Sequence, residues 1–469
     1  MFDLIIKNGR VFNAYTSFLA DIAIRDEKIV SLSENGSLHG AGRVIDAEGL
    51  YVIPGIVDPH LHVHAGMDGI YDILDHYTAS QCAAFGGVTT MLDFTETRKG
   101  ASVLQAVKNR NEDMSISAID YGIHAKFIEA SEDIVKEISD IVKYGCPSFK
   151  LFMTYRRSGF MIEDEDILKI MMEAKKWGAM VGFHAENNAI VEHCTDRCVR
   201  EKRVQWSDFP RSRPNICEAE AVNRVIEYAR FTECKIYIFH LTTGEAKDLV
   251  RKAQMDGVGV IAETCPHYLS LTDAEYNCED GHLRMMTPPL RSTKDQKKLW
   301  EGLNDGTLTI IGSDNCTFSR EIKEKNLDRD ESGKAIPDFT KVITGSSGIE
   351  ERLALLIAKG INTGRIDWNR LVRMTSYNPA RTFGLYPQKG DIAVGFDADI
   401  VLIDPHKQMT LTKDVLHYDQ GYTIYDGIET TGWPVMTIRR GEILVEDGEF
   451  LGKRGSGRFV RRQLEPGSN

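Results

Sequence analysis

Histidines stand at the ends of several apolar runs in this sequence, and they are the first candidates for chemistry. His60 and His62 are two residues apart in DPHLH, His184 ends the run MVGF, and His240 ends the run IYIF. Side chains alternate along a strand, so His60 and His62 would point to the same side and could bind one metal ion together. An H-x-H pair alone is a weak signal, because two ordinary surface histidines are the more common explanation.

Two further ionisable residues occupy comparable positions. Asp314 ends the run LTIIGS, and Lys150 lies inside SFKLF. Any one of these residues alone would be interpreted as a hydrogen-bonded core histidine, a capping carboxylate or a paired lysine. Their joint occurrence on different apolar runs instead predicts a shared site, because the ends of barrel strands meet at one face.

Lys150 is unusual because a lysine between Phe149 and Leu151 is costly to bury as an ammonium. It could extend its charge to solvent or pair with a carboxylate. An ammonium has no lone pair and therefore cannot ligate a metal. If carbon dioxide adds to the neutral amine, the resulting carbamate has two oxygens that can bridge two cations. We therefore hypothesise that Lys150 is an N6-carboxylysine.

Strands and helices must bring these residues to one face of the fold. Between about residue 54 and residue 390, strand-like apolar runs alternate with amphipathic stretches such as EDEDILKIMMEAKKWG and EAEAVNRVIEYARF. The strand-like runs are GIVDPHLH, GVTTMLDF, SAIDYGIHAKF, SFKLFMTY, MVGFHAE, KIYIFHL, GVIAETCPHYL and LTIIGSD. This alternation predicts the α/β class and a parallel (β/α)8 TIM barrel.

The pattern of apolar and polar residues at both ends of the chain differs from that of the middle. Short alternating runs bounded by Gly, Asn or Asp, such as DLIIKNGRVFN near the start and VMTIRRGEILVEDGEFL near the end, are typical of strands and turns. The prediction is a small β-sandwich domain formed by both termini, residues 1–53 plus 390–469 with the C-terminal tail included. It would accompany a catalytic barrel of residues 54–389.

The composition restricts the class of partner and the compartment. A formal net charge of −12, from 57 basic and 69 acidic residues, argues against a nucleic-acid or anionic-membrane partner. No apolar run approaches the roughly 18 residues of a membrane span, and the N-terminal residues show no signal-peptide pattern. The nine cysteines form no C-x-x-C pair and are typical of reduced thiols. We expect a cytoplasmic protein.

Five segments, in this order, resemble the cyclic amidohydrolases, closest to the dihydropyrimidinases and hydantoinases: DPHLH, SFKLFMTY, HAEN, FHLT and GSDNCTF. The likeness covers nearly the whole chain and includes VIPGIVDPH, TCPHYLSL and GDIAVGFDADIVLIDP. It implies two divalent metal ions per subunit, usually zinc, although manganese or cobalt would also suit these ligand types. The implied ligands are His60, His62 and Asp314 for one ion, His184 and His240 for the other, and carboxylated Lys150 bridging both.

The resemblance also implies a reaction. A cyclic amide bond in a dihydropyrimidine or 5-substituted hydantoin ring would be hydrolysed to an N-carbamoyl amino acid by a hydroxide that bridges the two metals. Asp314 would accept the hydroxide proton and pass it to the leaving nitrogen. Tyr155 matches the family's phenol donor to the developing oxyanion, although a packing role at the barrel rim would otherwise be preferred. The resemblance further implies a homotetramer and a small-molecule substrate.

The expected substrate pocket departs from the family at two positions. Thr287 in MTPPLR stands where relatives usually have serine, and Thr344 in FTKVITGSSG aligns with their asparagine. Both positions are expected to contact the planar imide of the substrate. An allantoinase, an L-hydantoinase and a cyclic imidase of the same superfamily therefore stay open as alternatives. A non-catalytic dihydropyrimidinase-like assembly protein is disfavoured, because every expected ligand is present.

The pocket that receives the ring substituent is predicted from the segment after Lys150. Phe152, Tyr155 and Phe160 are expected to line it, and an apolar lining suits an aryl or alkyl substituent. His64, two residues beyond His62, is interpreted as a substrate-pocket histidine or a support for the metal ligands.

Overall fold

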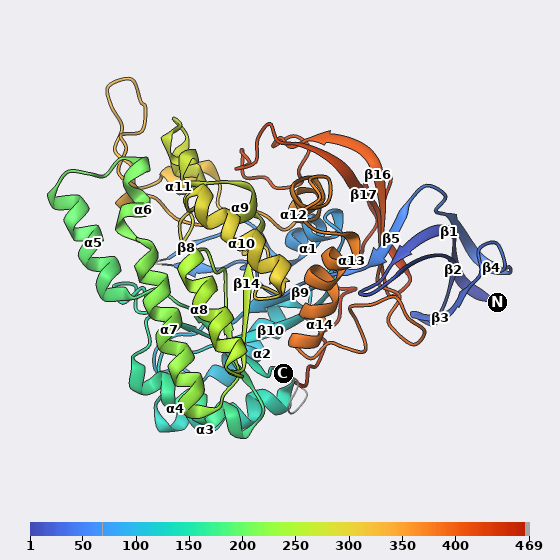
Figure 1. Ribbon diagram of the computed structural model, residues 1–469, viewed down its shortest axis with the longest axis horizontal. Helices are drawn as coiled ribbons and strands as arrows, with labels where there is room; N and C mark the ends of the chain where they lie inside the picture. The colour runs from blue at the N-terminus through green and yellow to red at the C-terminus, as the bar shows by residue number, and fades with distance from the viewer. Residues whose placement is uncertain (68, 465–469) are drawn as a thin grey trace.

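The computed structural model describes residues 1–67 and 69–464, and its centre is a parallel β-barrel (Figure 1). Its strands pair in chain order, β6-β9-β10-β11-β12-β13-β14-β15, so each neighbour in space is the next barrel strand along the chain. The bounds are β6 Ile56–Asp58, β9 Val88–Phe94, β10 Asp120–Lys126, β11 Ser148–Phe152, β12 Met180–His184, β13 Ile236–Ile238, β14 Val260–Thr264 and β15 Ile310–Ile311. The predicted TIM-barrel fold class is confirmed.

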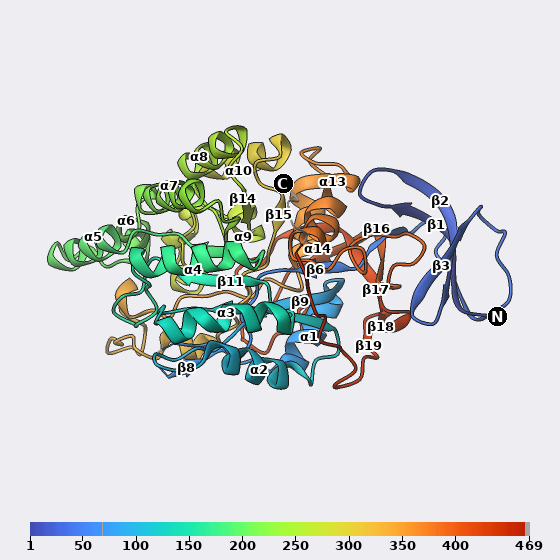
Figure 2. The same cartoon turned by 90° about the horizontal axis from the view of Figure 1, so that it is seen from below.

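Helices follow the strands and cover the outside of the barrel, as Figures 1 and 2 show from two sides. In α4, Asp164, Glu165 and Asp166 lie in the first turn and Lys175 and Lys176 in the last, which favours a helix through its dipole. The longer helices are α1 His76–Phe85, α2 Val103–Met114, α3 Glu132–Tyr144, α4 Asp164–Lys176, α5 Asn188–Arg200, α7 Asn215–Thr232, α8 Gly244–Met255 and α10 Thr293–Asp305. The short ones are α6 Phe209–Ser212, α9 Pro266–Ser270, α11 Arg320–Glu324, α12 Arg352–Leu356, α13 Trp368–Val372 and α14 Asn378–Thr382. None of these helices is long and apolar enough to cross a bilayer.

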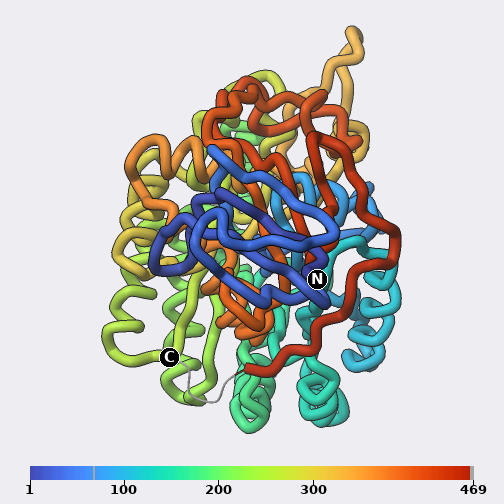
Figure 3. The backbone as a smooth tube through the Cα atoms, turned by 90° about the vertical axis from the view of Figure 1, so that its right-hand side faces the viewer, coloured from blue at the N-terminus to red at the C-terminus, as the bar shows by residue number. Residues whose placement is uncertain are grey.

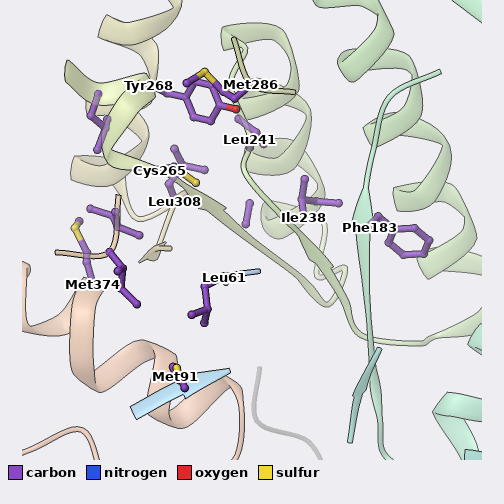
Figure 4. Close-up of a cluster of buried hydrophobic side chains, with 14 of the residues drawn as sticks. Leu61, Met91, Phe183, Ile238, Leu241, Cys265, Tyr268, Met286, Leu308 and Met374 are labelled. Carbon is purple, nitrogen blue, oxygen red and sulfur yellow. The ribbon is translucent and has the colours of Figure 1, made fainter. Parts of the chain in front are cut away.

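The apolar side chains between strands and helices fix which residues face the barrel interior. Figure 4 shows part of this layer, with Phe183 of β12, Ile238 of β13 and Met91 of β9 among the labelled residues. Because side chains alternate along a strand, an outward Phe183 places His184 on the inner side. Inside the barrel, Phe94 and Phe239 belong to a separate apolar cluster.

The barrel closes just beyond the ends of its first and last strands. The backbone N–H of Asp314 donates to the carbonyl of His60 at 2.8 Å, and that of His62 donates to the carbonyl of Asn315 at 2.7 Å. Leu61 and Asn315 form a parallel bridge between these hydrogen bonds. The contacts that close the barrel therefore also bring His60, His62 and Asp314 side by side.

Strands from both ends of the chain form one mixed nine-stranded sheet, and Figure 3 shows the two ends on the same side of the molecule. Its order is β19-β18-β17-β16-β5-β1-β2-β3, with β4 paired to β1. Leu4, Ile22, Leu402 and Ile438 contribute to a core of its own. The bounds are β1 Phe2–Phe12, β2 Ser17–Arg25, β3 Lys28–Ser33, β4 Ala41–Asp46, β5 Tyr51–Pro54, β16 Ile400–Thr410, β17 Glu429–Arg439, β18 Glu442–Glu446 and β19 Glu449–Phe450. A small hairpin, β7 Gly66–Met67 and β8 Ile70–Tyr71, lies outside both sheets.

A buried ion cluster joins this sheet to the barrel. The Lys389 ammonium lies 2.7 Å from Asp120, 2.7 Å from Asp399 and 3.1 Å from Asp397. The three carboxylates raise the pKa of Lys389 although burial opposes the shift. Asp120 begins β10, so the cluster lies at the N-terminal end of the barrel, where side chains contribute to stability rather than catalysis.

Candidate metal centre and active-site cavity

The predicted ligands converge at the C-terminal end of the barrel. Ligand atoms of His60, His240 and Asp314 all lie within 4.8 Å of one another. Asp314 Oδ1 is 3.0 Å from His60 Nε2 and 3.5 Å from His62 Nε2. The rings of His184 and His240 have centroids 4.4 Å apart. Residues separated by more than 250 positions in the chain thus form one cluster.

Three residues of the site adopt left-handed backbone conformations directly after their strands. The φ angles are 37° for His240, 50° for Asp314 and 66° for Tyr155. Such conformations are costly for non-glycine residues and concentrate at functional sites, where the surrounding structure holds them in place. They turn each side chain away from the strand direction and towards the mouth of the barrel.

Buried carboxylates orient two of the histidines. His60 Nδ1 donates to Glu263, whose other oxygen accepts from the Tyr237 hydroxyl at 2.6 Å. His184 Nε2 donates to Glu186 at 2.7 Å. Metal-binding histidines characteristically donate their second ring N–H to a carboxylate in this way. His60 is therefore left with Nε2, and His184 with Nδ1, as the nitrogen that could ligate a metal.

Two glycines make room for this packing. A Cβ atom on Gly312 would lie 2.7 Å from Glu263 Oε2 and 2.9 Å from the Cβ atom of His60. A Cβ atom on Gly182, the register partner of Lys150, would lie 2.2 Å from the ring of Phe239. A side chain at either position would displace the groups that support the cluster.

Lys150 is buried among aromatic rings. Its Nζ lies 3.8 Å from the ring centroid of Phe239 and 5.1 Å from those of Phe94 and Phe152. Among the described residues, no Asp or Glu oxygen lies within the 4.0 Å ion-pair distance of this Nζ. Burial lowers the pKa of Lys150 to about 7, so a substantial fraction of the side chain is a neutral amine at physiological pH.

The protonation states of the other residues suit cation binding. Burial lowers the pKa values of His62 and His184, and it lowers that of His240 well below the ordinary value. Burial opposes ionisation of Asp314, but His60 and His62 hold its pKa well below the usual range. Glu263 and Asp314 overcome the effect of burial on His60 and raise its pKa to about 9. A cation between His60 and Asp314 would take the place of that proton.

The donor set fits divalent metal ions. His60 Nε2 is buried without a hydrogen-bond partner among the described residues, although it faces Asp314. Imidazole nitrogens and carboxylate oxygens are common zinc ligands, and manganese or cobalt accept the same set. Lys150 fits as a ligand only after its amine has become an anion, because an ammonium offers no lone pair.

A cavity of about 330 Å³ opens directly above this cluster. His62, Lys150, His184, His240 and Asp314 form its floor, and the predicted pocket residues Phe152, Tyr155, Phe160, Thr287 and Thr344 also line it. The Tyr155 hydroxyl is hydrogen-bonded to the Thr287 hydroxyl. Burial raises the pKa of Tyr155 to about 12, which keeps its phenol protonated and able to donate.

His64 is not brought into this cavity. Its side chain is exposed and stacks on Tyr71, with ring centroids 5.0 Å apart. The backbone of His64 has a φ angle of 47°, so the alternation that relates His60 to His62 does not extend to it.

The supporting residues Glu263, Glu186 and Arg213 were not predicted from the sequence. Glu263 carries the same signal as Asp314, an ionisable residue at the end of an apolar strand, and could have been found by it. Glu186 bonds Arg213, which holds the pKa of that carboxyl at about 2 against the effect of burial. That pairing joins separate segments of the chain and leaves no local pattern.

Comparison with known proteins gives a consistent assignment. The model of the amidohydrolase family matches residues 51–444. A D-hydantoinase from Ralstonia pickettii is 37% identical over 464 residues, covering 98% of this chain and 99% of that protein. A D-phenylhydantoinase from Escherichia coli K12 is 36% identical over 463 residues, covering 98% of each chain. The crystal structure of a dihydropyrimidinase from Brevibacillus agri NCHU1002 superposes with a TM-score of 0.94 at 34% identity, covering 99% of both chains.

Replacing Glu263 should weaken metal binding while leaving every predicted ligand in place. We expect Glu263→Gln to lower the affinity for added zinc about 10–100-fold, because His60 loses the carboxylate that raises its basicity. Competition with a chromophoric chelator measures this affinity. Glu112→Gln, on the exposed side of α2, is the matched control. Equal zinc affinity in the two variants would show that Glu263 does not support a metal ligand.

Proposed function

This chain belongs to the amidohydrolase family, within its hydantoinase and dihydropyrimidinase group, and on that premise we propose that it opens hydantoin or dihydropyrimidine rings to N-carbamoyl amino acids. It is a hydrolase of cyclic amides. One observation supports this function above all: four histidines, Asp314 and a lysine buried among aromatic rings meet beneath a cavity of substrate size. Pockets of this size suit small molecules.

We propose that the site holds two divalent metal ions, most readily zinc. The proposed ligands are His60, His62 and Asp314 for one ion and His184 and His240 for the other, with Lys150 between them. Bound there, the metals would supply Lewis acidity and lower the pKa of water. His60 and His184 are held in orientation by Glu263 and Glu186, so these nitrogens need little rearrangement to bind.

Lys150 is proposed to be carboxylated. Its pKa of about 7 provides the neutral amine that carbon dioxide requires. The carbamate nitrogen–carbon bond forms as the amine loses a proton, and the product is an anion with two oxygens. That anion replaces a poorly solvated ammonium with a group that can pair with two cations.

Asp314 and Tyr155 are proposed to act on the substrate itself. Asp314 lines the cavity and is ionised, so it can hold the proton released by the attacking water and deliver it to the ring nitrogen that leaves. Tyr155 donates its phenol proton to the carbonyl oxygen, where negative charge develops. The Thr287 hydroxyl, bonded to Tyr155, would orient that phenol.

The pocket determines which cyclic amide is opened. Thr287 and Thr344 both line the cavity, as a contact with the planar imide requires. An allantoinase, an L-hydantoinase and a cyclic imidase share the proposed chemistry and differ in this pocket. We also propose a homotetramer in the cytoplasm, which light scattering and cell fractionation would test.

The ring-opening reaction can be tested directly on hydantoin, dihydrouracil, 5-phenylhydantoin, allantoin and succinimide. We expect hydantoins or dihydrouracil to be opened fastest, with the N-carbamoyl product measured colorimetrically. Dialysis against a chelator should abolish turnover, and zinc should restore it, because the metals supply the Lewis acid. Preference for allantoin or succinimide would select one of the alternative enzymes. Full activity in metal-free protein would refute the metal-dependent reaction.

Lys150→Ala should lose both turnover and bound metal, because the bridging ligand is removed. Short carboxylic acids such as acetate or propionate should partly restore both, since they supply a carboxylate in the space left by the side chain. Lys150→Arg is the matched control, because it keeps the positive charge but cannot form the carbamate and leaves no space for the acid. Metal content and rates measure the outcome. Fully metallated and active Lys150→Ala would contradict the carbamate.

Asp314→Asn should retain much of the metal while turnover falls about 10²–10⁴-fold, because an amide cannot carry the transferred proton. Metal analysis and kcat on the same preparation separate the two effects. Asp113→Asn, exposed on α2, serves as the control. A rate within a factor of a few of the unaltered protein would assign the proton transfer to another group.

A further inference from the structure

A second lysine lies at the barrel mouth beside Lys150. Lys126 ends β10 and is the register partner of Lys150 on β11. Only 6% of its surface is exposed, and it lines the cavity above the metal centre. The ends of barrel strands at this face supply the residues that contact substrates. Neither the metal site nor the proposed hydrolysis uses Lys126.

The tips of the two lysines diverge. Lys150 Nζ lies against Phe94, Phe152 and Phe239 at the floor of the site. Lys126 Nζ instead lies 5.0 Å from the ring centroid of Phe160, which belongs to the wall expected to receive the ring substituent. Phe152 and Phe160 are in contact, with centroids 6.0 Å apart. The ammonium of Lys126 therefore borders the substituent pocket rather than the reacting bond.

The hydrogen-bonding capacity of Lys126 is only partly used. Among the described residues, its one hydrogen-bond acceptor is Glu96, at 3.3 Å. Glu96 is shared with Arg110, whose Nη2 is 3.5 Å away, and 40% of the Glu96 side chain is exposed. An ammonium has three donors, so two of them can still serve a ligand in the cavity.

Lys126 also differs from Lys341, another lysine that lines the cavity. Lys341 is 37% exposed and pairs with Asp328, at the solvent side. Burial lowers the pKa of Lys126, and Glu96 counteracts this effect only in part. An anionic group bound in the cavity could accept hydrogen bonds from the two N–H donors of the Lys126 ammonium that Glu96 does not use.

We propose that Lys126 makes this enzyme selective for ring substrates whose substituent ends in a carboxylate. The inference rests on the proposed function, because it places the ring at the metal centre and its substituent against Phe152, Phe160 and Lys126. The apolar rings would enclose the methylene part of the substituent, and the ammonium would bind its carboxylate. Arg110 holds Glu96, which keeps that acid from being left without a cation when Lys126 turns to the substrate.

The test compares carboxylates with uncharged isosteres. We would measure kcat/KM for 5-(carboxymethyl)hydantoin and 5-(2-carboxyethyl)hydantoin, for the two matching carboxamides, and for unsubstituted hydantoin. The unaltered protein should prefer the better carboxylate over its carboxamide by about 10–100-fold, the range of a buried hydrogen bond to a charged group. Lys126→Met should abolish this preference, and Lys126→Arg should retain part of it.

Variants of two other charged residues of the cavity test whether Lys126 itself sets the preference for the carboxylate. Glu96→Gln should increase the preference for the carboxylate, because it removes a competing negative charge from the same ammonium. Lys341→Met should leave the preference intact, since that cation lies at the solvent side. Thermal unfolding of Lys126→Met and of a second variant, Lys126→Gln, verifies that each is folded. A preference that survives in both folded variants would overturn the inference.

The outcomes separate this inference from the proposed function. If hydantoin is opened but carboxylates and carboxamides react equally, Lys126 is not a selectivity residue while the hydrolase function stands. If no ring is opened, the proposed function fails, and calorimetric binding of 5-(carboxymethyl)hydantoin decides the inference. Tighter binding to the unaltered protein than to Lys126→Met supports it, and equal binding overturns it.

Discussion

The site depends on one electrostatic constraint, which is the burial of Lys150 among aromatic rings with no carboxylate of the described residues in ion-pair range. An ammonium there is destabilised, and its pKa falls to about 7. Burial lowers the pKa values of His62, His184 and His240, so these histidines are neutral, and Asp314 is ionised. A cluster of lone pairs facing one another is unfavourable unless cations separate them. Conversion of the lysine to an anion, together with two metal ions, would resolve both problems at once.

The two ends of the barrel have different roles: the N-terminal end contributes to stability, and the C-terminal end carries the groups that face the cavity. At the N-terminal end, Lys389 pairs with Asp120, Asp397 and Asp399. The C-terminal segment is held by the hydrogen bond from Val460 N–H to the Tyr121 carbonyl. These carboxylates could be mistaken for a metal site, but a lysine already occupies their centre. At the other end, charged groups are left with incomplete pairing. The left-handed backbones of His240, Asp314 and Tyr155 lie at this face, and the ion cluster at the opposite end helps to hold the barrel that positions them.

The sequence predicts the barrel and the ligand cluster because each proposed ligand lies in or at the end of an apolar run of strand length, a pattern that can be recognised without tertiary information. It fails where geometry is set by long-range contacts. The sequence alone suggests a pocket or supporting role for His64, but the chain turns at His64 and its side chain stays exposed. The pairing of Glu186 with Arg213 could not be predicted, since neither residue carries a local signal. The barrel closes between His60 and Asp314 through backbone hydrogen bonds, and such bonds cannot be predicted from the pattern of residue types.

Thr287, Thr344 and Lys126 contribute different hydrogen-bonding groups to the cavity wall, so they affect substrate selectivity to different degrees. The Thr287 hydroxyl bonds the Tyr155 phenol, so this position can orient the proposed donor. Thr344 contributes one hydroxyl and one methyl group to the cavity wall. Lys126 brings an ammonium beside Phe160, and this ammonium pairs with Glu96 at 3.3 Å. Reaction chemistry in this fold is fixed by groups on the strand ends, whereas selectivity follows from which wall groups are left without partners. A half-paired buried ammonium discriminates between substituents more strongly than a change in apolar volume, because one methylene alters binding by only about 1–3 kcal/mol while an unpaired charge can cost more.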